Sequence, residues 1–484
     1  MPDLRRESRD VANSLADRLA LSCQRFAALT AVSDEDDALS YAEFGQRAEG
    51  LARELRASGL PRHAPVIVKV ANRARDIVAF QAVWLAGGVV VPLHRDTPAQ
   101  VLLEALSSVR PAAVVDGDTI DMLASQPEIW SSDLQGAALI VLTSGSTGKP
   151  KGVILSHAAF SGKLDANQSR LRFSPAAMSL LVLQITFSFG IWFSLLTLQE
   201  GGHLLIRRKF SPATIWDASS RYAVANLAVV PTMIRSLLNE RQAMPRPLSS
   251  PRLLTGGEPL ANTLIGSVLD MFPGAQIVDI YGLTETCTSD FMSIADSNTN
   301  KGGIGLPAPE IEFRIVDEQG EHVLKGEAGE LQIKTPFIMN GYLNEPELTA
   351  SAFSGKFFKT GDVARERHDG TVELVGRAKE LISRGGNKIA PLELDHIIMR
   401  HPDVADVLTA GVPDQLLGER IHVLVVPKPG ASLDESGLRD WLSERLDRFK
   451  RPDIYHFGRE IPLGRSGKGD RRLLRESIIA GKIA

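Results

Sequence analysis

The chain contains little cysteine, little net charge and no apolar leader. Its 484 residues include two cysteines, Cys23 and Cys287, which argues against a disulfide framework and predicts a reducing, cytoplasmic location. The formal charge is −4, from 54 basic and 58 acidic residues, so the composition gives no reason to expect a nucleic-acid partner. Residues 1–8 carry acidic side chains and no apolar segment, and no secretory signal is expected.

Long apolar runs are equally scarce. One segment, residues 178–198, has no charged residue and is long enough by count to cross a bilayer,. Polar or small residues interrupt it at Gln184, Ser188 and Gly190, and the sequence has no second such segment. We therefore predict a buried strand, turn and helix that line a pocket, and no integral membrane segment. Contact with a membrane surface stays an alternative.

Strand and helix patterns alternate along the first 300 residues. Short apolar runs typical of buried strands are separated by amphipathic stretches, which predicts parallel sheets covered by helices on both faces. The helix after Ser40 is opened by a capping box that ends at Glu43,. Strands are expected at residues 66–70, 89–91, 112–115, 204–206 and 227–230, and helices at 40–55, 74–86, 99–109, 158–167 and 232–240.

The pattern changes twice further along. Between residues 311 and 369, short alternating runs separated by Gly-containing turns predict antiparallel β structure,. After residue 379 a small α+β unit is predicted, with a helix at 392–400, strands at 404–410 and 421–426, and a helix opened by a capping box from Ser432 to Glu435,.

The predicted fold class is α/β. Two packed βα-alternating sheets are expected over about residues 40–305 and a small antiparallel β-barrel-like subdomain over about 306–378. Both belong to a predicted large domain of residues 1–378, and a small mobile α+β domain of residues 379–484 follows. A chain of this length can bury a substantial core in each part.

Residues 141–152, Val-Leu-Thr-Ser-Gly-Ser-Thr-Gly-Lys-Pro-Lys-Gly, have the character of a phosphate-binding loop. Glycines and small hydroxyl residues let backbone N–H groups wrap an anion, and Lys149 and Lys151 supply positive charge. Only two residues separate Gly145 from Gly148, and a proline follows Lys149, so this is not the Walker loop of P-loop NTPases. The flanking apolar runs predict that the loop joins two strands. A mobile Gly/Ser linker is the alternative.

Five further motifs follow this loop in order. They are Tyr281-Gly-Leu-Thr-Glu-Thr286, Thr360-Gly-Asp362, Gly376-Arg-Ala-Lys-Glu380, Gly385-Gly-Asn-Lys-Ile389 and Gly467-Lys468. With the loop, they resemble the motifs of the adenylate-forming superfamily, which comprises acyl-CoA synthetases, peptide-synthetase adenylation domains and luciferases. The resemblance extends from about residue 40 to residue 474.

The resemblance implies a reaction and a role for each motif. A carboxylate attacks the α-phosphorus of ATP and pyrophosphate leaves, so the protein must position groups and neutralise charge. Lys468 is implied to contact the carboxylate and the α-phosphate, Thr284 the α-phosphate, and Glu285 Mg²⁺, a hard cation that prefers carboxylate oxygen. The implied nucleotide-binding residues are Thr143, Ser144, Gly145, Ser146, Thr147 and Lys151 in the loop, Gly257, Glu258 and Tyr281 at the adenine, and Asp362 and Arg377 at the ribose.

The family carries out two half-reactions in one site by turning its small domain, and the resemblance implies that Lys379 is the hinge. Residues 382–391, which include Gly385 and Gly386 among the implied cofactor-binding residues, resemble acyl-CoA ligases more than peptide-synthetase domains. The resemblance therefore favours coenzyme A as the acyl acceptor.

The implied acid pocket is apolar. It is expected to be lined by Phe187, Phe189, Gly190, Trp192, Pro231 and Gly256. Amino-acid-activating domains carry an aspartate where Gly190 stands, and many acyl-CoA ligases carry a histidine where Phe187 stands. An apolar acid is expected, and the alternative for the aromatic residues is that they belong to the core.

The sequence therefore predicts an AMP-forming carboxylic acid:CoA ligase that uses ATP, Mg²⁺ and coenzyme A. One alternative is a stand-alone ligase that loads the phosphopantetheine thiol of a carrier protein. Another is a catalytically inactive nucleotide-binding regulatory protein, against which the joint presence of Glu285, Asp362, Arg377 and Lys468 argues.

Overall fold

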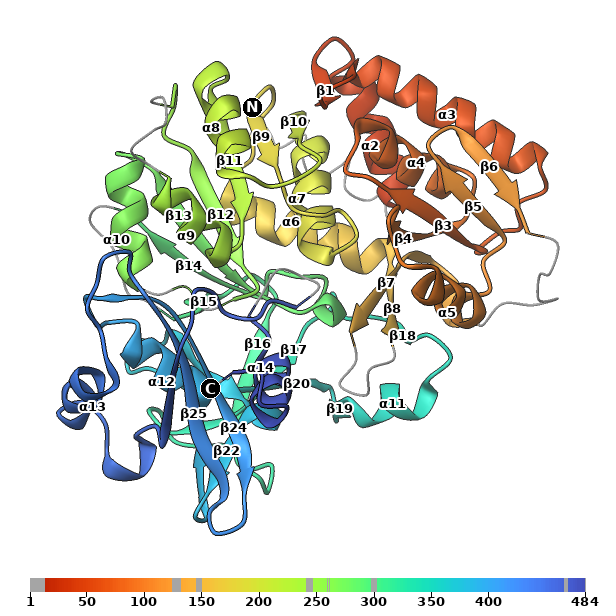
Figure 1. The fold of residues 1–484 in the computed structure, drawn as a ribbon. Helices are drawn as coiled ribbons and strands as arrows, with labels where there is room; N and C mark the ends of the chain where they lie inside the picture. The colour runs from red at the N-terminus through yellow and green to blue at the C-terminus, as the bar shows by residue number, and fades with distance from the viewer. Residues whose placement is uncertain are drawn as a thin grey trace.

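The computed structural model describes residues 14–123, 132–144, 150–240, 247–258, 260, 262–296, 303–464 and 469–483. Within these residues the strands form four sheets. Two large sheets with their helices lie together in Figure 1, and two smaller sheets lie below them in that view. The α/β fold class predicted from the sequence is confirmed.

A seven-stranded sheet contains the first βα units. Strand β3 pairs in parallel with both β4 and β5. Strands β7 and β8 form an antiparallel hairpin, and β8 also pairs with β18. The strands are β3 (Pro65–Val70), β4 (Val89–His94), β5 (Ala113–Asp116), β6 (Thr119–Met122), β7 (Ala137–Ser144), β8 (Pro150–Ser156) and β18 (Gly341–Tyr342). The helices before and between them are α2 (Leu15–Arg25), α3 (Tyr41–Ala57), α4 (Ala74–Leu85) and α5 (Ala99–Val109), and η1 (Ser132–Leu134) precedes β7. The predicted capping box of Ser40 and Glu43 is present at the start of α3.

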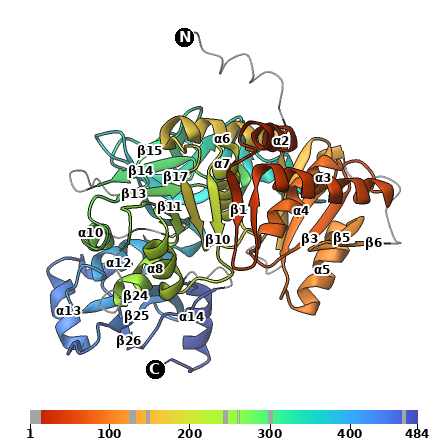
Figure 2. The ribbon, with the colours of Figure 1, turned by 90° about the horizontal axis from the view of Figure 1, so that it is seen from above.

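A nine-stranded sheet lies beside the first one, as the view from above shows (Figure 2). Its strands are β1 (Thr30–Ser33), β2 (Ala38–Ser40), β9 (Met178–Leu181), β10 (His203–Ile206), β11 (Val224–Val229), β12 (Arg252–Gly256), β13 (Gln276–Tyr281), β14 (Phe291–Ala295) and β15 (Leu306–Pro307). Its helices are α6 (His157–Leu171), α7 (Ser188–Gln199), α8 (Pro212–Arg221), α9 (Pro231–Asn239) and α10 (Asn262–Met271). One core cluster takes apolar side chains from both sheets, so the two sheets pack together as predicted.

The uncharged segment 178–198 forms β9, a turn and α7, and most of its side chains are buried in the core. This is the strand, turn and helix that the sequence predicts. Among the described residues, no helix combines the length and the apolar character needed to span a bilayer.

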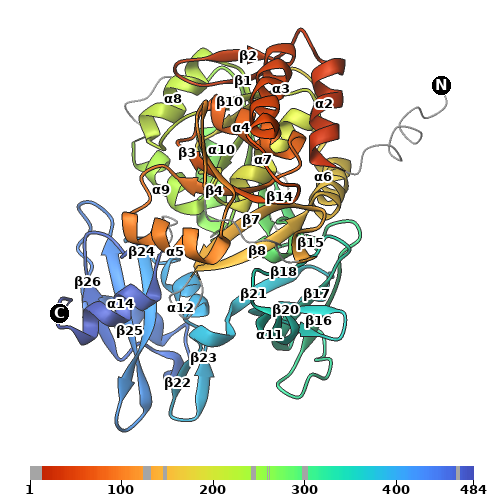
Figure 3. The same ribbon diagram turned by 90° about the vertical axis from the view of Figure 1, so that its right-hand side faces the viewer.

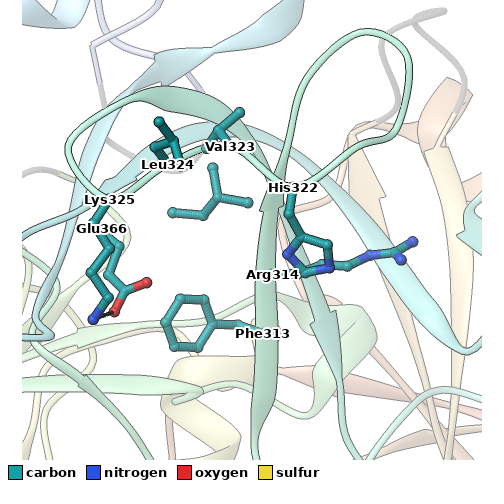
Figure 4. Close-up of a pocket in the computed structure, with 8 residues that line it drawn as sticks. Phe313, Arg314, His322, Val323, Leu324, Lys325 and Glu366 are labelled. Atoms are coloured by element: carbon teal, nitrogen blue, oxygen red, sulfur yellow. Dashed lines mark ion pairs between the residues drawn. The ribbon is translucent and has the colours of Figure 1, made fainter.

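The third sheet has five strands that pair antiparallel, as the alternating pattern predicts. They are β16 (Glu312–Val316), β17 (Ala328–Lys334), β19 (Phe353–Ser354), β20 (Phe357–Glu366) and β21 (Val372–Arg377), with α11 (Pro346–Ser351) before β19. A cavity of about 100 Å³ lies at this sheet. Figure 4 shows side chains that line it, among them the ion pair of Lys325 and Glu366. No motif residue lines this cavity, so it is not the site that the motifs predict.

The fourth sheet belongs to the C-terminal unit, which lies next to the third sheet in Figure 3. Its strands are β22 (Ile382–Arg384), β23 (Asn387–Ile389), β24 (Val404–Asp414), β25 (Gly418–Pro427) and β26 (Ile454–Phe457), and its helices are α12 (Pro391–Ile398), α13 (Glu435–Ser443) and α14 (Arg471–Ile479), with η5 (Arg448–Lys450). Its apolar clusters contain only residues from 382 onward. The predicted domain boundary between residues 378 and 379 lies in the 3-10 turn η4 (Ala378–Glu380), and a division there stays a prediction.

One predicted helix start was wrong. The sequence pattern places a capping box at Ser432, but α13 begins at Glu435 and its N-cap is Asp434, whose carboxylate accepts a hydrogen bond from the Gly437 N–H. Aspartate caps as well as serine does. The helix therefore begins close to the predicted position, but Asp434 caps it and Ser432 does not.

Candidate active site

The β7–β8 hairpin presents the predicted phosphate loop. Gly145, Ser146 and Thr147 lie outside the described residues, as does the side chain of Ser144. On the described flanks, the Thr143 hydroxyl lies 3.4 Å from the backbone oxygen of Lys151. The Lys151 ammonium lies 5.3 Å from the ring centre of Tyr342 on β18. The hairpin thus carries a cation at the end next to the loop, as a polyphosphate site requires,.

The motif at residues 281–286 ends in the 3-10 turn η3 (Thr284–Thr286), which is bound on two sides. The Tyr342 hydroxyl donates to Glu285 Oε1 at 2.8 Å, and the Met339 N–H donates to the Glu285 backbone oxygen at 2.8 Å. On the other side, the Thr284 hydroxyl lies 3.2 Å from the hydroxyl of Ser188 at the start of α7. The turn therefore joins the phosphate-loop hairpin to the predicted acid pocket.

Asp362, Arg377 and Tyr281 form one cluster. Asp362 and Arg377 are directly opposite each other on β20 and β21, and the Arg377 Nε lies 3.0 Å from Asp362 Oδ1. The Tyr281 hydroxyl donates to Asp362 Oδ2 at 2.7 Å. Burial raises the pKa of Asp362, and the neighbouring guanidinium opposes that shift,. A fixed carboxylate beside an exposed guanidinium can accept and donate hydrogen bonds to a pair of hydroxyl groups.

Glu285 is the residue that fits a metal ion. Its carboxylate is half-buried and oriented by Tyr342, and carboxylate oxygen is the ligand that Mg²⁺ prefers. Within the described part of the chain, no group of three or more His, Cys, Asp or Glu side chains could hold a metal ion. Mg²⁺ commonly binds through one or two carboxylates together with substrate phosphates and water, and one oriented carboxylate at this turn fits that kind of site.

Two glycines in the predicted pocket are required by close packing. A Cβ on Gly190 would lie 2.4 Å from the Gln184 backbone oxygen, and one on Gly256 would lie 2.3 Å from the Ile280 backbone oxygen. Neither position can accept a side chain without a shift of the backbone. An aspartate in place of Gly190, as in amino-acid-activating domains, is therefore incompatible with this backbone.

The remaining pocket residues fall into two groups. Phe187 is 41% exposed at the start of α7, Phe189 is partly buried, and Pro231 begins α9. Trp192 is fully buried and its indole N–H donates to Asn167 Oδ1 at 2.9 Å. For Trp192 the core alternative fits its burial better than a place on the pocket surface.

The predicted adenine segment lies at the end of β12. Gly257 has a φ of +80°, a conformation that favours glycine,. The next residue, Glu258, accepts a hydrogen bond from the Thr232 hydroxyl at 2.9 Å and lies 3.4 Å from the guanidinium of Arg235. This joins the segment to α9 and therefore to Pro231.

The C-terminal unit supplies the remaining predicted residues. Lys379 is exposed in η4, and Gly385 and Gly386, with φ of +56° and +85°, form the turn between β22 and β23. Lys468 lies outside the described residues.

Arg471 is a partly buried residue whose contacts no sequence motif predicts. Its side chain lies 2.6 Å from Asp395 and 3.2 Å from Glu380 and is 16% exposed. It therefore attaches helix α14 to both α12 and the predicted hinge.

Tyr342 is a functional candidate that the sequence did not reveal. It contacts Glu285 across 57 positions of the chain because β18 pairs with β8, and β18 is only two residues long. A two-residue strand leaves no periodic pattern, and no motif that we recognised includes Tyr342.

Comparisons with known proteins agree with this geometry. Two family models match: the AMP-binding enzyme model over residues 19–135 and 124–343, and the AMP-binding enzyme C-terminal domain model over residues 393–468. The feruloyl-CoA synthase of an Amycolatopsis species is 31% identical, over 91% of this chain and 94% of its own length. Pyochelin synthase PchD of Pseudomonas aeruginosa is 28% identical, over 96% and 92%.

Among solved structures, the amide bond synthetase McbA of Marinactinospora thermotolerans superposes with a TM-score of 0.86. It is 25% identical, and the match covers 96% of this chain and 99% of the other. The likeness therefore includes the large sheets and the C-terminal unit together.

Proposed function

Since the chain belongs to the AMP-binding enzymes, the adenylate-forming family, we propose that it activates a small carboxylic acid. The acid reacts with ATP to give an acyl-adenylate and pyrophosphate, and the acyl group then passes to coenzyme A. The observation that carries the proposal is the cluster around Asp362, beside the turn that presents Glu285. The Asp362 carboxylate lies 3.0 Å from the Arg377 guanidinium and 2.7 Å from the Tyr281 hydroxyl.

In the adenylation step the residues mainly position and neutralise charge. Asp362 and Arg377 hold the ribose hydroxyls, Tyr281 lies at the adenine, and Lys151 and Thr143 bind phosphate oxygens from the hairpin. Thr284 donates to the α-phosphate, and Lys468 neutralises the charge that develops when the carboxylate attacks. Mg²⁺ bound at Glu285 would neutralise the phosphates and favour the departure of pyrophosphate.

The acid is proposed to be apolar, because the start of α7 presents Phe187 and Phe189, and Gly190 has no room for a carboxylate that would pair with an ammonium group. An ammonium without a partner in an apolar pocket costs several kcal/mol. Free α-amino acids should therefore be poor substrates.

The identity of the acceptor rests on residues 382–391 and on the feruloyl-CoA synthase relative, both of which favour coenzyme A. A relative of similar coverage is a pyochelin synthase, and a superposable structure is an amide bond synthetase. A different acceptor, in particular a carrier-protein thiol, is therefore the second candidate. Coenzyme A and a holo-carrier protein offered to the same acyl-adenylate would separate the two.

The proposal is tested by acid-dependent pyrophosphate release over a panel of carboxylic acids. We expect release with at least one apolar acid, AMP as the second product, and a thioester when coenzyme A is added. No release with any acid, while ATP still binds, would favour the inactive nucleotide-binding alternative. The cytoplasmic location inferred from the two cysteines stays a prediction.

A further inference from the structure

A buried ion pair stands behind the turn that carries Glu285. Lys163, on α6, and Asp290, which lies after that turn and directly before β14, are each fully buried, and the ammonium lies 2.6 Å from Asp290 Oδ1. Burial raises the pKa of Asp290, and the Lys163 ammonium counteracts this shift,. Neither residue belongs to a motif with an assigned role.

Asp290 is bound directly to the motif. The hydroxyl of Thr286, which follows Glu285, donates to Asp290 Oδ2, and the Asp290 N–H donates to the Tyr281 backbone oxygen at 2.7 Å. Asp290 therefore contacts both ends of the segment 281–286. With Lys163 on its other oxygen, the carboxylate is held between α6 and the motif.

The backbone between Thr286 and Asp290 is strained. Cys287, Thr288 and Ser289 have φ of +57°, +66° and +57°, in the left-handed region that is unfavourable for a residue with a side chain,. The Asn167 amide of α6 donates to the Ser289 backbone oxygen at 3.3 Å. Helix α6 therefore holds residues 287–289 in a conformation that would otherwise relax. Relaxation there would displace the preceding turn η3, which carries Glu285.

Lys163 also touches the other segment that holds Glu285. Its ammonium lies 5.2 Å from the ring centre of Phe337, and Gly162 allows that approach, since a Cβ there would lie 2.6 Å from the ring. Two residues after Phe337, the Met339 N–H donates to Glu285. Both supports of Glu285, the turn and residues 337–342, therefore meet at Lys163.

We propose that Lys163 and Asp290 are positioning residues that set the place of Glu285, and with it the affinity of the site for metal-bound nucleotide. The inference rests on the proposed function, in which Glu285 holds Mg²⁺. A buried ion pair is weak evidence for stability, because apolar or neutral replacements of both partners are often tolerated. The contacts that it makes with both supports of Glu285 give it a positional role instead.

The test uses the full chain and the double variant Lys163→Met with Asp290→Asn, which removes both charges and leaves no unpaired ion. Calorimetry with a non-hydrolysable ATP analogue, with and without Mn²⁺, measures metal-bound and metal-free nucleotide affinity. Acid-dependent pyrophosphate exchange measures kcat and the KM for the acid. Tyr41→Phe is the matched control, because it removes buried hydrogen bonds to Leu198 and Gly202 in another part of the fold.

We expect the double variant to lose about tenfold in kcat and about fivefold or more in affinity for the metal-bound analogue, since small misplacements at a reacting site cost rate steeply. Affinity for the metal-free analogue and the KM for the acid should stay within about twofold, because the Asp362–Arg377 pair is held by its own contacts and Glu285 is the residue proposed to hold the metal,. The control should change none of these quantities beyond about twofold. Wild-type kcat and metal-bound affinity in the double variant would overturn the inference.

A second variant addresses the case in which the double variant fails to fold. Thr286→Val keeps the ion pair but removes the hydroxyl that joins Asp290 to the turn, and it should reproduce the loss of metal-bound affinity. Unchanged affinity in Thr286→Val would contradict the positioning role. No exchange activity in the wild-type protein would contradict the proposed function alone, since the calorimetric comparison does not depend on it.

Discussion

The nucleotide side of the site and the C-terminal unit are held in place by different kinds of contact. On the nucleotide side, Asp362 is 5% exposed and both of its oxygens are bound, at 2.7 and 3.0 Å. Two ion pairs between the C-terminal unit and the rest are longer: Arg235 with Asp406 and Lys388 with Glu318, each at 3.5 Å. The second of these pairs is 60% and 82% exposed, and exposed pairs contribute about 0–1 kcal/mol.

This difference suggests a division of the site. Buried, fully bound carboxylates are costly to rearrange, so the nucleotide half is expected to keep its geometry throughout the reaction. Weak ion pairs are easily broken, so the C-terminal unit can leave one position and adopt another. We propose that rotation of this unit at Lys379 lets one nucleotide half serve both half-reactions.

The largest expected effect comes from the residue that the mobile unit delivers. Lys468→Ala should lower adenylate formation by about a hundredfold or more, because the ammonium acts on charge that develops in the transition state. ATP affinity should hardly change, since the rigid half binds the nucleotide. Single-turnover formation of acyl-adenylate, with ATP binding measured separately, checks both. Comparable rates in variant and wild type would remove Lys468 from catalysis.

The next effect separates the two half-reactions. Lys379→Pro fixes φ and removes a backbone N–H, so the hinge can reach only one of two conformations. Substantial adenylation should remain, while acyl transfer to coenzyme A should fall by about tenfold or more. Equal loss of both would indicate misfolding or a direct catalytic role, and equal retention would move the pivot elsewhere.

A smaller effect is expected inside the rigid half. Asp362→Asn keeps the shape but weakens the charge-assisted hydrogen bonds, so ATP affinity should fall by about tenfold. The acyl-transfer rate from preformed acyl-adenylate should fall less than the adenylation rate at low ATP. Isothermal calorimetry with ATP measures the loss, and unchanged affinity would contradict the ribose assignment.

The smallest effect concerns the ion pair between the units. Asp406→Asn removes the charge that Arg235 contacts across the units and leaves the contact of Arg235 with Glu258 in place. We expect less than about a threefold change in either half-reaction, because partly exposed pairs are weak. Asp217→Asn, which breaks a surface pair with Arg221 on α8, is the matched control. A change of tenfold in one half-reaction only would show that this pair determines the position of the C-terminal unit.

The sequence predicted most of the fold because its signals are local. The capping box at Ser40, the alternating runs of β16 and β17, and the two strands around the phosphate loop all depend on residues close in sequence. Where the signal was ambiguous, as between Ser432 and Asp434, the element was found and its boundary was wrong.

The site residues could be predicted only where they belong to a recognisable motif. The motifs predict that Asp362 and Arg377 both bind the ribose, and the structure brings the two residues together. Contacts between distant segments were not visible: Tyr342 with Glu285, Lys163 with Asp290, and Arg471 with Glu380. Each depends on how sheets and helices pack, which one sequence does not reveal.

We propose that the C-terminal unit occupies two positions over a nucleotide half that stays fixed. The distance between spin labels at Leu324→Cys, in the loop between β16 and β17, and Leu416→Cys, in the loop between β24 and β25, reports these positions in a Cys23→Ser background. Both leucines are well exposed, at 74% and 87%, and Cys287 is buried. We expect one distance distribution with ATP and a different one with acyl-adenylate and coenzyme A. A single unchanged distribution in all ligand states would contradict it.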